Sequence, residues 1–233
     1  MMATFVLLPG AGSDSFYWHR VVPMLSNNGH SVVTVDLPYS QKGVGQYEFA
    51  DLVVDAVTGI AGPLVLVAQS MSAFTAAIVC EKATVDLLVL VAPMVPAPGE
   101  SAGEWWENTG QPAARREADI EAGRDPDAPM DPRPLFFHDV PEDVVEQVFQ
   151  REEVAMSDTS FETVWDAQQW PDVPIRVVAG QFDRLFPLDF LKALARERIG
   201  VEPDVVEAGH LIALSRPEQL ASMLEEYVTS SPG

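Results

Sequence analysis

The chain has 233 residues, of which 47% are hydrophobic and 21% charged, a balance typical of one globular domain that buries a sizeable core. Its 35 acidic residues outnumber the 14 lysines and arginines, and the net charge of −21 excludes nucleic acid and anionic lipid surfaces as partners. A single cysteine, Cys80, excludes an internal disulfide and a cysteine-based zinc site.

The start of the chain lacks the basic residues and the long apolar core that are typical of a signal peptide. No apolar run approaches the ~20 residues that a membrane-spanning helix needs. We therefore expect a cytoplasmic protein, a monomer or homodimer, that has a small-molecule substrate and no membrane or nucleic-acid partner.

Six apolar runs with helical patterns between them predict an α/β fold in three layers, with a mainly parallel six-stranded sheet. Strands are expected at residues 5–8, 31–35, 64–68, 87–91, 175–179 and 204–207. Helices are expected at residues 15–26, 47–60, 71–82, 188–198 and 217–229. The continuous apolarity of the strands indicates that helices cover both faces of the sheet.

The turn after the first strand, at residues 9–14, is rich in glycine. Such a loop can direct a backbone N–H at negative charge that develops on an oxygen, and we expect the amide of Ala11 to do so. A phosphate-binding loop is excluded, because Gly10-Ala11-Gly12 lacks the third glycine of that pattern. His19 follows in the next helix and is a candidate to line a substrate pocket.

Ser70 stands between an apolar strand and a helix, the setting of a nucleophile elbow. In such a turn the strand and the helix lie so close that the flanking residues must be small, and Ala68 and Ser72 meet this condition. The N–H of Met71 would join that of Ala11 to form an oxyanion hole. The alternative is that Ser70 only caps the helix, as many serines do.

Residues 93–170 break the alternation of strands and helices, and they are rich in proline, acidic residues and aromatics. A structureless loop of this length is improbable inside a compact domain, so we expect a helical cap inserted between two parts of the core, residues 1–92 and 171–233. Helical pieces are expected at residues 103–108, 112–122, 141–154 and 160–169.

Aromatic side chains are concentrated in this insert, which contains four of the five tryptophans. We expect an apolar lid over a small hydrophobic substrate, and its candidate pocket residues are Trp105, Trp106, Phe137 and His138. The alternative is that these side chains only pack the insert onto the sheet.

Asp183 and His210 each follow a predicted strand, at 175–179 and 204–207. The interval of 27 positions from Asp183 to His210 leaves room for one helix and one strand, which would return the histidine to the same sheet edge. Catalytic groups of open α/β sheets collect at that edge. With Ser70 the two residues can form a Ser-His-Asp triad, whereas the four scattered histidines predict no metal site.

The chain resembles the α/β-hydrolase superfamily over its whole length, in residues 5–12, in Ala68-Gln69-Ser70-Met71-Ser72 and in Gly209-His210-Leu211. The order Ser, Asp, His is the order that this superfamily uses. The chain looks most like the small cofactor-free members that include plant methylesterases and hydroxynitrile lyases, although Pro9 and Gln69 stand where histidine is common.

This resemblance implies a serine hydrolase without cofactor or metal that cleaves a small hydrophobic ester, lactone or thioester through an acyl-enzyme, with Ser70, Asp183 and His210 as its triad. Two alternatives stay open. One is a lyase that breaks a C–C bond with the same triad, although Leu211 stands where the hydroxynitrile lyases carry a lysine. The other is a receptor that binds a small ligand without turnover.

Overall fold

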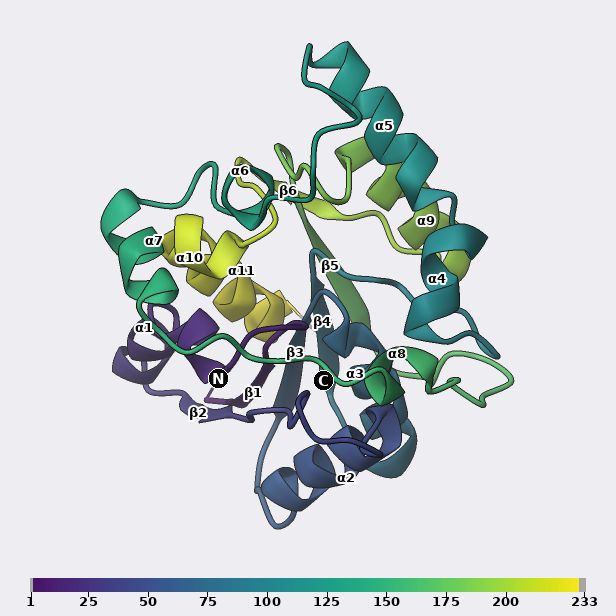
Figure 1. Cartoon of the computed structure of the whole chain (residues 1–233). Helices are drawn as coiled ribbons and strands as arrows, with labels where there is room; N and C mark the ends of the chain where they lie inside the picture. Colours follow the sequence, from purple (N-terminus) through teal and green to yellow (C-terminus); the bar gives the residue numbers. More distant parts are fainter. Residues whose placement is uncertain (1, 231–233) are drawn as a thin grey trace.

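The computed structural model describes residues 2–230. Its core is one parallel sheet with the strand order β2-β1-β3-β4-β5-β6 (Figure 1). The strands are β1 Thr4–Leu8, β2 Ser31–Thr34, β3 Leu64–Gln69, β4 Leu87–Val91, β5 Ile175–Gly180 and β6 Asp204–Val206. Each strand begins and ends within one residue of its predicted position, and every neighbouring pair is parallel. The predicted α/β fold class is confirmed.

Strand register brings the loops that carry the predicted site to one edge of the sheet. Leu8 at the end of β1 pairs with Ala68 of β3, and Gln69 at the end of β3 pairs with Val91 of β4. All three strands are buried along their whole length, because helices cover both faces. The loops after β1, β3 and β4 therefore leave the sheet side by side.

Helices cover the two faces of the sheet in separate groups (Figure 1). One face carries α1 Val22–Asn27, α10 Ile212–Ser215 and α11 Pro217–Ser230, and the other carries α2 Gln46–Val57, α3 Ser72–Lys82 and α9 Leu188–Ile199. A hydrophobic cluster fills the space under each group. Among the helices of residues 2–230, none is both long and apolar enough to cross a bilayer.

The predicted helix over residues 15–26 is wrong in part. The structure has a 3-10 helix, η1 Ser15–Trp18, followed by α1. Pro23 lies in the first turn of α1, where its missing N–H leaves no hydrogen bond unmade. In the middle of a longer helix the same proline would remove a hydrogen bond and clash with the preceding turn.

The insert, residues 93–170, joins β4 to β5 through α4 Ala102–Asn108, α5 Gln111–Glu121, α6 Pro132–Phe136, α7 Glu142–Phe149 and α8 Thr159–Glu162. The first two match the predicted positions closely. The short helix α6 was not predicted; it begins where the Asp131 side chain accepts a hydrogen bond from the Arg133 amide at 3.0 Å.

The last two insert helices are shorter than predicted, and tertiary contacts explain why. After α7 the Arg151 guanidinium lies over the Phe16 ring and pairs with Asp14, two contacts with the segment that contains η1. After α8 the chain forms an isolated antiparallel bridge between Val164 and Ser101. None of these contacts can be predicted from the local sequence.

The insert shares its core with the sheet. Trp105 and Trp165 of the insert are fully buried in the same hydrophobic cluster as Phe74 of α3 and Phe186, which follows β5. The division of the chain at residues 93 and 170 into a core and a cap stays a prediction.

Candidate active site

Ser70 occupies a sharp turn between β3 and α3. Its φ angle is +54°, a left-handed conformation that costs a non-glycine residue about 1–3 kcal/mol. Two hydrogen bonds hold it there: the Ser70 amide donates to the Val91 carbonyl at 3.0 Å, and the Met94 amide donates to the Ser70 carbonyl at 3.1 Å. This strand–turn–helix is the geometry of a nucleophile elbow.

The flanks of this turn are small and buried. Ala68 and Ser72 are fully shielded from solvent, and the Ser72 hydroxyl donates to the Gln69 carbonyl at 2.8 Å or to that of Leu8 at 3.3 Å. A larger side chain at either position would force α3 away from β3. The side chain of Ser70 would then no longer be held in one orientation.

Asp183, His210 and Ser70 form one hydrogen-bonded chain. The Nδ1 atom of His210 lies 2.8 Å from Oδ2 of Asp183, and its Nε2 atom lies 3.2 Å from the hydroxyl oxygen of Ser70. If Nδ1 donates to the carboxylate, Nε2 is left to accept the proton of the hydroxyl. The structure therefore joins three residues that are far apart in the sequence.

The Asp183 carboxylate is held from a second side. Its Oδ1 atom accepts hydrogen bonds from the amides of Leu185 at 2.8 Å and Phe186 at 2.9 Å, in the turn that leads to α9. The side chains of Asp183 and His210 are 0% and 3% exposed. Electrostatic interactions are stronger in such a buried place than in water, so the carboxylate can stabilise positive charge on the imidazole.

The glycine-rich turn after β1 lies beside Ser70. A Cβ atom at Gly10 would overlap Oε1 of Gln69 and would lie 3.1 Å from the Ser70 Cβ, so a larger residue here would have to displace the Gln69 side chain. The amides of Ala11 and Met71 donate no hydrogen bond within residues 2–230. Both N–H groups are free to bind an oxygen of a ligand.

Two phenylalanine rings flank His210. The Phe186 ring centroid is 5.1 Å from that of the imidazole, and the Phe136 centroid, from α6 of the insert, is 5.6 Å away. Neither was a candidate from the sequence. Phe136 is next to the predicted Phe137 in the sequence, and Phe186 immediately precedes Pro187 at the start of α9. Nothing in the local sequence indicates which of these rings contacts the histidine.

The two tryptophans predicted to line the pocket, Trp105 and Trp106, differ in burial. Trp105 is fully buried, and its indole N–H donates to the Val95 carbonyl at 2.9 Å, so it packs the insert onto the core and has no surface open to a substrate. Trp106 is half-buried, with its ring centroid 6.0 Å from that of Phe186. Of the two, only Trp106 retains exposed surface.

Phe137 and His19 each contact another aromatic ring. Phe137 contacts the Phe149 ring with centroids 5.2 Å apart, on the α1 and α11 side of the sheet. His19 stacks on the Phe16 ring at 4.0 Å, and its Nδ1 atom lies 2.7 Å from the Phe16 carbonyl oxygen. Within residues 2–230, neither side chain makes a ring contact or hydrogen bond with Ser70, Asp183 or His210.

His138 lies next to the triad but not in it. Its Nε2 atom is buried and has no hydrogen-bond partner within residues 2–230. Burial and the neighbouring Arg184 guanidinium lower the pKa of His138. The adjacent Asp139 was not a candidate from the sequence; its Oδ2 atom accepts a hydrogen bond from the Gly209 amide at 2.7 Å.

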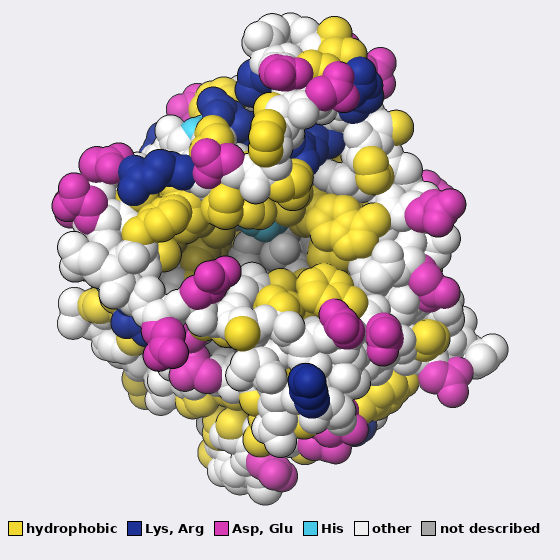
Figure 2. Space-filling view, viewed as in Figure 1, with side chains coloured by type: hydrophobic (Ala, Val, Ile, Leu, Met, Phe, Trp, Pro, Cys, Tyr) yellow, Lys and Arg dark blue, Asp and Glu magenta, His cyan; other side chains and the backbone are white. Residues whose placement is uncertain are grey.

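The molecule is hollowed on the face drawn in Figure 2, where hydrophobic side chains surround a depression that has a histidine inside it. A cavity of about 950 Å³ lies between α5 and the turn that holds Asp183, and its lining includes Asp183, Arg124, Arg184 and His138. It is lined by charges of both signs, since Glu117 and Asp189 also reach it.

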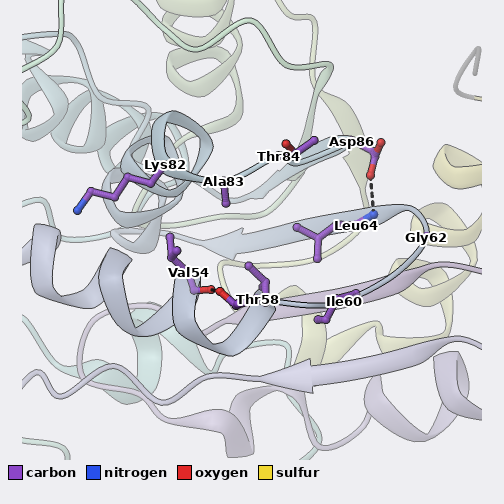
Figure 3. Close-up of a pocket in the computed structure, with 10 residues that line it drawn as sticks. Val54, Thr58, Ile60, Gly62, Leu64, Lys82, Ala83, Thr84 and Asp86 are labelled. Carbon is purple, nitrogen blue, oxygen red and sulfur yellow. Dashed lines mark hydrogen bonds between the residues drawn. The ribbon is translucent and has the colours of Figure 1, made fainter.

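Another cavity, of about 430 Å³, lies at the other end of the sheet (Figure 3). Leu64, the first residue of β3, lines it, whereas Ser70 follows the last residue of the same strand. The Asp86 carboxylate in this cavity accepts a hydrogen bond from the Leu64 amide at 2.7 Å. This cavity is therefore separate from the triad.

Comparison with known proteins gives matches over nearly the whole chain. The sequence profile described as "Alpha/beta hydrolase family" matches residues 5–223. "Norfluorocurarine synthase 1" of Strychnos nux-vomica is 22% identical over 251 aligned positions, which cover 95% of this chain and 94% of that protein.

Solved structures share the fold at low sequence identity. A pyrethroid hydrolase from Sphingobium faniae superposes with a TM-score of 0.75 at 17% identity, covering 99% of this chain and 98% of that one. Polyneuridine aldehyde esterase gives 0.76 at 18% identity, with coverages of 98% and 100%. A methylesterase from Arabidopsis gives 0.73 at 17% identity, with coverages of 98% and 99%.

Proposed function

Since the chain belongs to the alpha/beta hydrolase family, we propose that it is a serine hydrolase that cleaves a small, uncharged, hydrophobic carboxylic ester. The observation that carries this proposal is the hydrogen-bonded chain from Asp183 through His210 to Ser70. A serine hydroxyl is a weak nucleophile by itself, and a histidine that accepts its proton activates it.

In the proposed first half-reaction, the Ser70 oxygen attacks the ester carbonyl carbon while its proton passes to Nε2 of His210. The amides of Ala11 and Met71 bind the resulting oxyanion; one such donor typically contributes about 3 kcal/mol to the stability of the transition state. The tetrahedral intermediate then expels the alcohol, which takes the proton from His210, and the acyl group stays on Ser70.

In the second half-reaction, a water molecule attacks the acyl carbon and gives a proton to His210. The intermediate collapses, the carboxylic acid leaves, and Ser70 recovers its proton from His210. Asp183 keeps its charge in both halves and stabilises the imidazolium that forms twice in each cycle. Its two hydrogen bonds from Leu185 and Phe186 keep it in position.

Three observations support a hydrophobic and uncharged substrate. Phe136 and Phe186 flank His210, where the leaving alcohol must collect its proton. The depression in Figure 2 is surrounded by hydrophobic side chains. The net charge of −21 disfavours anionic substrates. The names of the similar structures, a pyrethroid hydrolase and two esterases, fit a function in ester cleavage.

The proposal is tested with Ser70→Ala and a series of p-nitrophenyl esters graded by acyl length. We expect kcat to fall by about 10⁴-fold or more, because the nucleophile is removed. A fluorophosphonate probe should label the unmodified protein and not the variant. Ser26→Ala, at an exposed position in α1, is the matched control and should behave as the unmodified protein.

Hydrolysis by Ser70→Ala at the rate of the unmodified protein would exclude the mechanism. Labelling of Ser70 without hydrolysis of any ester in the series would favour the other reactions of such a triad, a C–C bond lyase in particular. Failure of the probe to label Ser70 would favour a receptor that binds without turnover.

A further inference from the structure

Gly209, the residue before His210, is enclosed from two sides. On the side of the sheet, a Cβ atom at Gly180 would lie 2.6 Å from the Ala208 carbonyl oxygen, so the end of β5 lies directly against this loop. On the side of the insert, a Cβ atom at Gly209 would lie 2.6 Å from Oδ1 of Asp139 and 2.8 Å from Nε2 of His138. The backbone before the histidine therefore has no room to shift toward either neighbour.

The sheet holds the loop through backbone hydrogen bonds. The Gln181 amide donates to the Val206 carbonyl at 2.7 Å, and the Phe182 amide donates to the Ala208 carbonyl at 2.8 Å. The second bond holds the carbonyl end of the peptide that joins Ala208 to Gly209. Neither bond holds the N–H end of that peptide.

The insert holds the N–H end of this same peptide. The Gly209 amide donates to Oδ2 of Asp139 at 2.7 Å, across 70 residues of sequence. A carboxylate forms a stronger hydrogen bond to an amide than a neutral acceptor does. Asp139 is three residues from Phe136, whose ring lies against that of His210, so one short segment of the insert contacts both the backbone and the ring at the histidine.

We propose that Asp139 is a positioning residue that holds the Gly209 peptide so that His210 stays in hydrogen-bonding reach of Ser70. This inference rests on the proposed function. It implies that Ser70 is reactive only when the insert packs against the loop that carries His210. Asp139 acts through the backbone and does not touch the reacting atoms. A misplacement of about 1 Å in such a group can lower a rate by as much as 100-fold.

The test compares Asp139→Ala, which removes the acceptor, with Asp139→Asn, whose amide oxygen can still accept from Gly209. For Asp139→Ala we expect kcat for the best p-nitrophenyl ester to fall by about tenfold, with KM changed by less than about twofold. Asp139→Asn should recover most of kcat. Asp143→Ala removes the same charge from an exposed position in α7 of the insert and should leave kcat unchanged.

A second readout does not depend on turnover. The proton between Nδ1 of His210 and Asp183 gives a low-field NMR signal, which His210→Ala assigns by removing it. We expect Asp139→Ala to shift or broaden this signal while the thermal unfolding midpoint shows that the variant is folded. This readout tests Asp139 even if Ser70→Ala shows that the proposed reaction is wrong.

Three results would overturn the inference. One is a rise in KM with kcat unchanged in Asp139→Ala, which would assign Asp139 to substrate binding. Another is an equal loss of kcat in Asp139→Ala and Asp139→Asn, which would assign the effect to charge and not to the hydrogen bond. The third is an unchanged NMR signal in a folded Asp139→Ala variant.

Discussion

At the scale of single residues, the site depends on a few positions where the backbone is strained or where no side chain fits. Ser70 and Ala92 are the non-glycine residues with positive φ within the described chain, at +54° and +43°, and each directly follows one of the neighbouring strands β3 and β4. The Met94 amide, two residues after Ala92, donates to the Ser70 carbonyl. The two strained turns therefore support one another.

Gly10 offers a test at this scale. In Gly10→Ala the new Cβ atom would overlap Oε1 of Gln69, a side chain that is 3% exposed and has little room to move. The loop that carries the Ala11 amide must then shift, and we expect kcat for ester hydrolysis to fall by about 10- to 100-fold. Steady-state kinetics on p-nitrophenyl esters measures this.

The double variant Gly10→Ala with Gln69→Ala is the control, because the shortened side chain leaves space for the new methyl group. It should recover kcat to the level of Gln69→Ala alone. A double variant as slow as Gly10→Ala would show that the overlap with Gln69 is not the cause.

At the scale of elements, a buried ion pair joins the insert to α9. The Arg198 guanidinium makes two hydrogen bonds to Glu100, at 2.5 and 3.0 Å, and donates to the Val95 carbonyl at 2.7 Å. The two side chains are only 11% and 4% exposed. Asn108 at the end of α4 also donates to Glu100, at 2.9 Å, so one carboxylate connects three parts of the fold.

We predict that Glu100→Ala lowers the free energy of unfolding by about 3–5 kcal/mol, because it leaves the buried Arg198 charge without a partner. Glu142→Ala breaks the exposed pair with Arg133, whose side chains are 69% and 49% exposed, and should cost less than about 1 kcal/mol. Urea titration followed by circular dichroism measures both. Equal losses in the two variants would contradict the argument from burial.

At the scale of the whole molecule, the net charge of −21 sets the electrostatic potential that a substrate meets. At low ionic strength this potential extends over about 30 Å, and at about 0.15 M salt over about 8 Å. It repels anions and lowers their concentration at the surface.

We therefore predict that salt changes the selectivity between esters of different charge. At low ionic strength, kcat/KM for an anionic p-nitrophenyl ester should be about tenfold lower than for a neutral ester of matched length. Added NaCl should narrow this gap and leave the neutral ester nearly unaffected. A ratio that does not depend on salt would show that the overall charge has no part in selectivity.

Prediction from sequence succeeded where one local pattern decides the outcome. Apolar runs located all six strands within one residue. The signal is strongest for β1, β3 and β4, since burial along the whole strand leaves few other structures for such a run. The same logic placed Ser70 in a turn between small residues. It failed at residues 15–26, where Pro23 fits the start of a helix but not its middle.

The amino-acid pattern was enough to predict a serine, an aspartate and a histidine, in this order along the chain, that each follow a strand of one parallel sheet. The ends of such strands meet at one edge. Which side chains of the insert reach that edge could be seen only in the folded chain. Phe136 lies against His210 while Phe137 turns away, and Asp139 binds Gly209 across 70 residues. The physical reason is that such contacts depend on how helices of an irregular insert pack, and adjacent residues of one segment then face opposite directions.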